Sequence, residues 1–178
     1  MGKIFAQLTE NHISFVNRQV IFFVGTAAAE GSVNISPKGL DSLRVIDETR
    51  LIWLNLTGSG NETAAHLLQN NRMTIMFCAF EGKPLILRVY GRAEMYHEGD
   101  AEWDEHIGLF PNFNGRRQLM DLKIERVQSS CGFAVPFMDF VGERDQLTKW
   151  SANKGREGIE EYWNQKNVTS IDGFSTDM

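Results

Sequence analysis

The sequence predicts a mainly β protein in which antiparallel strands form a closed barrel, with short helices at its periphery. Three observations favour this class. Six or so strand-length segments, either apolar or alternating, make up most of the chain; short turns join many of them; and helical spacing dominates the last part. A regular alternation of strand and helix is absent, which argues against a doubly wound parallel sheet. Closure into a barrel is favoured because it removes exposed strand edges.

Length and composition indicate one globular domain over residues 1–178, with the barrel at about 18–136 and C-terminal helices at about 143–167. The net charge is −5 and no basic block occurs, so binding to nucleic acid is not expected. No apolar run reaches membrane-spanning length and the N-terminus has no signal-peptide core, so we expect a cytoplasmic protein. Cys78 and Cys131 lie in apolar segments and are interpreted as buried free thiols.

The first third of the chain is expected to contain one short helix followed by three strands. The helix is predicted at 9–17, and the strongly apolar segment 20–28 is the first core strand. A hairpin turn at Glu30-Gly31 leads into the alternating strand that begins at Val33. The nearly continuous apolar run 51–56 is typical of a strand buried on both faces.

The middle of the chain is expected to hold a helix and two further strands. Ser59 and Glu62 fit a capping box, which predicts a helix start at Ser59 or within two residues of it. A strand at 72–80 and a turn precede the segment 85–96, which alternates most regularly. Its apolar face, from Leu85 to Met95, is assigned to the core; its polar face is open to solvent, a ligand or a partner chain.

The last third is expected to combine helices with one long strand. Residues 99–120 are polar and broken by Pro111, which indicates two short helices. The long strand is predicted at 122–135, followed by two helices at 144–153 and 158–166. The tail after Ser170 is expected to be loose.

Two polar clusters interrupt the hydrophobic pattern and suggest a binding site. The turn Thr57-Gly58-Ser59-Gly60 precedes a helix, whose start leaves backbone N–H groups free for an anion such as phosphate. Ser36 and Lys38 share one face of an earlier strand, so a lysine could complete the pocket if the strands pair. An ordinary capped helix and a solvated lysine are the alternatives. The four histidines are scattered and predict no metal site, and no P-loop or nucleophile-elbow motif occurs.

These segments resemble a known family. The order of NISPKG (34–39), LNLTGSGNET (54–63) and LRVYGRAE (87–94) is similar to that in the pyridoxamine 5′-phosphate oxidase-like family of FMN-binding split barrels. The later segments SSCGFAVP (129–136) and RDQLTKW (144–150) resemble a subgroup of that family. The resemblance covers roughly residues 13–173.

The resemblance implies a six-stranded antiparallel split barrel that forms a homodimer with one FMN in each of two interface grooves. It places the isoalloxazine ring against Leu54, Asn55 and Leu56. The family's phosphate-binding turn carries two basic residues that are absent here, and Lys38 or Arg88 would replace them. The implied cofactor-binding residues are Ser36, Lys38, Leu54, Asn55, Leu56, Thr57, Ser59, Gly60, Asn61, Arg88 and, covering the flavin from the partner subunit, Trp150.

The function implied by the resemblance is that of an FMN-dependent oxidoreductase. Hydride transfer to or from the flavin needs no side-chain acid or base, and none is obvious in the sequence. The R-x-H element with which the oxidases hold their substrate is absent, which argues against oxidation of pyridoxamine 5′-phosphate. A non-enzymatic flavin-binding or sensing protein on the same barrel is the alternative.

Overall fold

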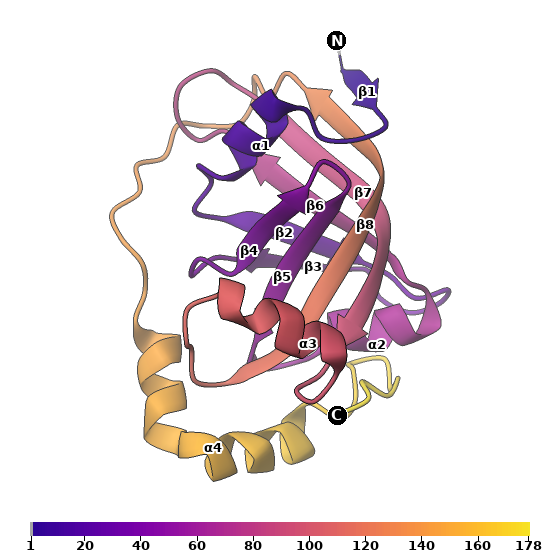
Figure 1. The fold of residues 1–178 in the computed structure, drawn as a ribbon, viewed down its shortest axis with the longest axis vertical. Coiled ribbons are helices and arrows are strands. Elements are labelled where there is room, and N and C mark those ends of the chain that lie inside the picture. Colours follow the sequence, from indigo (N-terminus) through magenta and orange to yellow (C-terminus); the bar gives the residue numbers. More distant parts are fainter. Residues whose placement is uncertain (1) are drawn as a thin grey trace.

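The chain forms a strongly curled antiparallel sheet with helices on its outside (Figure 1). This computed structural model describes residues 2–178. The eight strands are β1 (Lys3–Phe5), β2 (Phe22–Thr26), β3 (Asn34–Lys38), β4 (Leu43–Asp47), β5 (Arg50–Leu56), β6 (Arg72–Cys78), β7 (Ile86–Tyr96) and β8 (Arg116–Ser130). The order in the sheet is β3-β2-β6-β7-β8-β5-β4, and β1 pairs with β8.

The curled sheet is a split barrel, as the family resemblance implies. It is not the closed barrel that the strand pattern favours, because β3 and β4 remain as its two edges. The two strands beyond the predicted six are the short β1 and β4. β4 pairs only with Arg50–Trp53 of β5, so Asn55 and Leu56 have a strand neighbour on the β8 side alone. The end of β5 therefore borders the split in the barrel.

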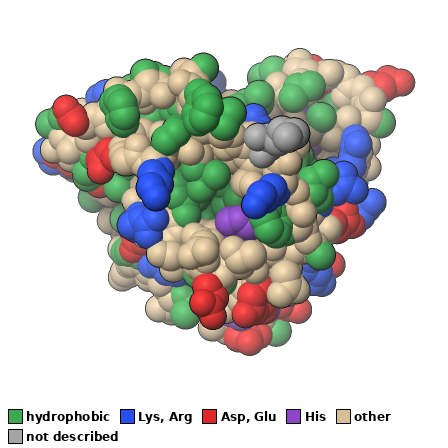
Figure 2. All heavy atoms as spheres, turned by 90° about the horizontal axis from the view of Figure 1, so that it is seen from above, with side chains coloured by type: hydrophobic (Ala, Val, Ile, Leu, Met, Phe, Trp, Pro, Cys, Tyr) green, Lys and Arg blue, Asp and Glu red, His purple; other side chains and the backbone are tan. Residues whose placement is uncertain are grey.

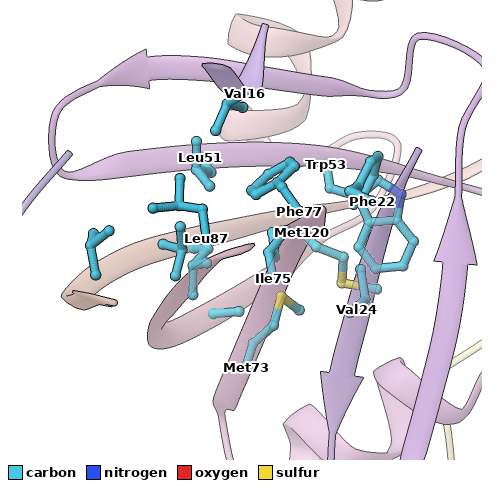
Figure 3. Close-up of a cluster of buried hydrophobic side chains, with 14 of the residues drawn as sticks. Val16, Phe22, Val24, Leu51, Trp53, Met73, Ile75, Phe77, Leu87 and Met120 are labelled. Carbon is cyan, nitrogen blue, oxygen red and sulfur yellow. The ribbon is translucent and has the colours of Figure 1, made fainter. Parts of the chain in front are cut away.

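The core of the barrel is filled by side chains from α1 (Glu10–Val16) and from β2 and β5 to β8 (Figure 3). Phe22 and Trp53 meet edge to face with ring centroids 6.3 Å apart. Burial of one large apolar side chain contributes roughly 1.5–3 kcal/mol. This packing fixes β2 and β5, each of which pairs with one of the two edge strands. The labelled members of the cluster are Val16, Phe22, Val24, Leu51, Trp53, Met73, Ile75, Phe77, Leu87 and Met120.

The helices lie at the periphery of the sheet. Besides α1 they are α2 (Glu62–Gln69), α3 (Ala101–His106), the 3₁₀ turn η1 (Ile107–Leu109) and α4 (Gln146–Lys166). α3 covers the outside of β5 and β8, where Trp103 packs in a cluster with Ile52, Leu54 and Leu119. Within residues 2–178, no helix combines the length and apolar character that crossing a membrane requires.

The predicted capping box at Ser59 is wrong. α2 begins at Glu62 after Asn61, and no side chain caps it. The Glu62 carboxylate instead accepts hydrogen bonds from the backbone N–H of Ile171, at 3.2 and 3.3 Å. Because the Glu62 carboxylate contacts the C-terminal tail, it does not act as the capping-box partner of Ser59. Ser59 therefore lies in the loop before α2.

The long strand was predicted too late in the chain. β8 begins at Arg116 and ends at Ser130, whereas the sequence predicts 122–135. Gly115, with φ of +75°, makes the turn before it. Polar residues of its first half are buried with partners: Asp121, for example, accepts from Arg50 at 2.8 Å. The two predicted short helices occur as α3 and η1 in direct succession, before this turn.

The C-terminal region is also more ordered than predicted. The two predicted helices are present as the two arms of α4, which the non-helical backbone of Gly155 separates. The tail is not loose: Thr169 bridges Ser175, and Thr176 is fully buried. Of the two cysteines only Cys78 is buried, since Cys131 lies exposed just beyond the end of β8.

Candidate anion-binding site

A cavity of about 370 Å³ lies at the split of the barrel. Three polar side chains of β3 form one wall, namely those of Asn34, Ser36 and Lys38. The opposite side is formed by the end of β5, the loop after it and the start of α2, and Arg117 and Ile171 close the cavity. The two polar clusters of the sequence are therefore brought together. Of the predicted residues, the lining includes Ser36, Lys38, Asn55, Leu56, Ser59, Gly60 and Asn61.

Lys38 is the central cation of this site. Its Nζ lies 4.7 Å from the centroid of the Trp53 ring, so the core aromatic supports the ammonium by a cation–π contact. Burial and, to a smaller extent, the positive charge of Arg117 lower the pKa of Lys38 to about 8. Both effects disfavour the charged amine in the absence of a nearby anion.

Arg117 on β8 is the second cation. Its side chain is buried, and burial lowers its pKa to about 10. Nη1 donates to the backbone oxygen of Gly60 at 3.1 Å and to Oδ1 of Asn167 at 2.7 Å. Nε is buried without a hydrogen-bond partner. Within residues 2–178 no carboxylate forms an ion pair with Lys38 or Arg117.

The loop between β5 and α2 supplies backbone donors. Among residues 2–178, no backbone oxygen accepts from the N–H of Ser59, Gly60 or Asn61. Neutral donors of this kind, next to a helix start, favour a bound anion. The loop is fixed from behind, since the Thr57 hydroxyl donates to the oxygen of Gly115 at 2.8 Å and accepts from Trp163 Nε1 at 2.8 Å.

Hydrogen bonds tie β3 to α2 beside the cavity. The Ser36 hydroxyl donates to Oδ1 of Asn34 at 3.0 Å, and Nδ2 of Asn34 donates to Thr63 Oγ1 at 3.3 Å. On the opposite side, Asn55 Nδ2 donates to Oδ1 of Asn61 and to Oε1 of Gln118. These contacts hold the polar walls in place without using the cations.

A much larger groove, of about 1670 Å³, meets the cavity at Lys38. It lies between one end of the barrel and the chain that leads into α4. Several of its lining residues are apolar, including Phe15, Phe80, Leu85, Met138, Phe140 and Leu147. A ligand with an anionic group and a large apolar body could therefore place the anion at Lys38 and the body in the groove.

Four predicted residues lie outside the cavity. Leu54 is buried beneath α3, and Thr57 lies behind the loop. Arg88 donates to the Ser130 hydroxyl at 3.1 Å, and Trp150 packs against Tyr162 with ring centroids 5.1 Å apart. Between the two proposed replacement cations, the cavity of this chain contains Lys38 and not Arg88.

Sequence reasoning missed Arg117, because its segment was interpreted as helical. A usable signal was present: Asn114-Gly115 is typical of a tight turn before a strand, which would have placed Arg117 on that strand. The sequence carries no comparable signal for Ile171 and Asn167, because their hydrogen bonds to Glu62 and Gly58 each span 109 residues.

The split barrel places two cations, the buried Arg117 and the partly buried Lys38, at the split of the sheet. The family model described as pyridoxamine 5′-phosphate oxidase matches residues 8–131. The pyridoxamine 5′-phosphate oxidase family protein ustO of Aspergillus flavus is 31% identical, over 98% of this chain and 77% of that protein. The chain therefore belongs to the pyridoxamine 5′-phosphate oxidase family.

Solved structures share the fold. HupZ of Group A Streptococcus is 26% identical and aligns with a TM-score of 0.53, over 67% of this chain and 91% of HupZ. The FAD binding protein from Mycobacterium smegmatis is 12% identical and has a TM-score of 0.50, over 71% of this chain and 97% of that protein. At that identity the second likeness concerns the fold alone.

Proposed function

We propose that this chain is an FMN-binding protein and that it acts as an oxidoreductase on a small substrate. The observation that carries the proposal is the pair of cations formed by the buried Arg117 and the partly buried Lys38, without a carboxylate partner among the described residues. Buried charges are normally paired, so this arrangement favours a bound anion. Family membership and an FAD-binding protein of the same fold support a flavin as that ligand.

The phosphate of FMN fits the cavity by charge and by donors. Lys38 and Arg117 would supply the charge, while Ser36, Ser59 and the loop N–H groups would supply hydrogen bonds. Arg117 would thus replace, from another strand, the basic residues missing from the turn. The isoalloxazine would extend past Lys38 into the apolar groove.

The flavin, when bound, supplies hydride-transfer chemistry. The protein's part is then to hold the phosphate, to orient the ring and to exclude water. The cavity lining provides two cations and the Glu62 carboxylate, which already accepts from the Ile171 N–H. None of these groups is needed as a proton donor, because hydride transfer requires no side-chain acid. Because the R-x-H element is absent, we propose a substrate other than pyridoxamine 5′-phosphate.

We further propose a homodimer. The segment that connects β8 to α4, residues 131–145 (the connecting segment), runs along the outside of the barrel (Figure 1). Phe133, Phe137 and Val141 in it are 82%, 82% and 99% exposed. Hydrophobic side chains are also exposed on both sides of a hollow at the end of the molecule that carries α1 and β1 (Figure 2). A second copy could bury these groups, as apolar patches at interfaces are buried.

The cytoplasmic location stays a prediction.

The test is a titration of purified protein with FMN and with riboflavin, followed by quenching of flavin fluorescence and by the visible spectrum. We expect FMN to bind more tightly than riboflavin, because only FMN carries the phosphate that the cations recognise. Absence of FMN binding would overturn the proposal. Reduction of the bound flavin by NADH or NADPH supports the oxidoreductase, while no reduction by either donor favours a non-catalytic flavin-binding protein.

A further inference from the structure

The loop after β5 is held from outside the cavity by one fully buried side chain, that of Asn167 just after α4. Its Nδ2 donates to the backbone oxygen of Gly58 at 3.2 Å. Its Oδ1 accepts from Arg117 Nη1 at 2.7 Å, and the same Nη1 donates to the oxygen of Gly60 at 3.1 Å. Two carbonyl groups of the loop are therefore bound by a single amide–guanidinium pair.

This arrangement sets the direction of the loop's N–H groups. A peptide bond is planar and trans, so its N–H points opposite to its C=O. Because the oxygens of Gly58 and Gly60 point to Asn167 and Arg117, the N–H groups of Ser59 and Asn61 point away from them. Neither N–H has a backbone acceptor among residues 2–178, and both residues line the cavity.

Asn167 is itself fixed by its surroundings. Its N–H donates to the oxygen of Trp163 at 2.8 Å, and its own oxygen accepts from the hydroxyl of the buried Thr176. Gln118, next to Arg117 on β8, donates from Nε2 to Sδ of Met178 at 3.4 Å. The end of α4 and the C-terminal tail thus form one support behind the loop.

We propose that Asn167 is a positioning residue for phosphate recognition, which orients the loop 58–61 and the guanidinium of Arg117 without contacting the ligand. The amide suits this position because its Nδ2 donates to Gly58 while its Oδ1 accepts from Arg117, whereas an ionised carboxylate can only accept. Aspartate in its place would accept from Arg117, repel the Gly58 oxygen and neutralise the charge meant for the ligand. The proposal rests on the proposed function in that the phosphate belongs to FMN.

The test compares wild type with Asn167→Asp, using FMN, riboflavin and inorganic pyrophosphate as probes. Loss of a charge-assisted donor set is expected to weaken FMN binding by about tenfold or more. Riboflavin, which has no phosphate, should bind almost unchanged, so the preference for FMN over riboflavin should fall. Asn164→Asp adds the same charge to an exposed position of α4 and should leave all three affinities unchanged.

Unchanged FMN affinity of Asn167→Asp, or an equal loss for riboflavin and FMN, would overturn the proposal. If Asn167→Asp does not fold, Thr176→Val removes the hydroxyl that holds Asn167 and should lower FMN affinity more than riboflavin affinity; an equal effect on both overturns it. If wild type fails to bind FMN, the proposed function fails, and the positioning role is then decided by pyrophosphate, whose binding must weaken in Asn167→Asp.

Discussion

Lys38 and Arg117 bring like charges into one largely buried space, and the charge of Arg117 makes that of Lys38 less favourable. Trp53 offsets part of this cost for Lys38 through its ring face. A bound dianion would offset far more, since it interacts with both cations at low dielectric. At the scale of single residues, the cavity is therefore an electrostatic site that a bound anion would stabilise.

The affinity for FMN is expected to depend on pH through Lys38. Because the pKa of Lys38 is lowered to about 8, its amine in the protein without ligand is mostly protonated below pH 8 and mostly neutral above it. Because the phosphate binds the protonated form of Lys38, the dissociation constant of FMN should rise above pH 8, by up to roughly tenfold per pH unit. Arg117, with a pKa of about 10, remains largely protonated up to pH 9. Titrations from pH 7 to 9 check the slope.

Lys38→Ala is the matched test of that assignment. It should weaken FMN binding at pH 7 by about 1–3 kcal/mol, as expected for a charge-assisted bond, and abolish the slope above pH 8. Lys123→Ala, at an exposed lysine that pairs with Glu94, should change neither. A slope that persists in Lys38→Ala would assign the titration to another group.

At the scale of elements, the kink in α4 determines where its second half ends. Gly155 has φ of +66° and ψ of 178°, a conformation essentially restricted to glycine. The kink turns the last turns of α4, so that Trp163 reaches Thr57 and Asn167 reaches the loop. A straight helix would carry these residues in another direction, because a helix rises 1.5 Å per residue along one axis.

Two glycines of α4 should therefore respond in opposite directions to the same substitution. Gly155→Ala forces a strained conformation and should lower the free energy of unfolding by about 1–3 kcal/mol. Gly158→Ala lies in helical backbone with ordinary contacts, the nearest at 3.5 Å, and should raise it by roughly 0.5–1 kcal/mol. Urea unfolding of both variants measures the difference. Equal stabilities for the two variants would contradict this account of the kink.

At the scale of the whole molecule, the most exposed apolar side chains gather in the connecting segment. Phe133, Phe137 and Val141 point into solvent in a single chain, although apolar residues in that number are costly to leave in water. The same segment forms one side of the large groove that meets the cavity at Lys38. Association of two chains through this segment would therefore affect the groove as well as cover the exposed surface.

The double variant Phe133→Ser/Phe137→Ser should shift the proposed dimer to monomer, because it removes apolar area from an interface expected to bury about 1,200–2,000 Å². Leu68→Ser/Leu109→Ser changes the same number of exposed apolar residues, on α2 and η1, and should remain dimeric. Sedimentation velocity at micromolar concentration distinguishes the two. A monomeric wild type, or a double variant that stays dimeric, would contradict the homodimer.

The sequence determined the features that depend on local pattern. Strand alternation placed Ser36 and Lys38 on one face of β3, and the structure has both in the cavity wall. The apolar run at 51–56 and the glycines after it gave β5 and the loop that borders the split. Such patterns can be recognised in the sequence because the alternation of side chains along a strand and the residue preferences of turns depend on near neighbours in the chain.

Only the tertiary structure decided the partners of these groups. Arg117 reaches the cavity from β8. Buried polar residues are tolerated in this strand where hydrogen-bond partners satisfy them, so the strand lacks the usual apolar pattern. Asn167 meets Gly58 across 109 residues, and Glu62 leaves its expected cap for a tail equally far away. Hydrogen bonds between distant segments depend on how the elements pack, and no periodicity in either segment encodes them.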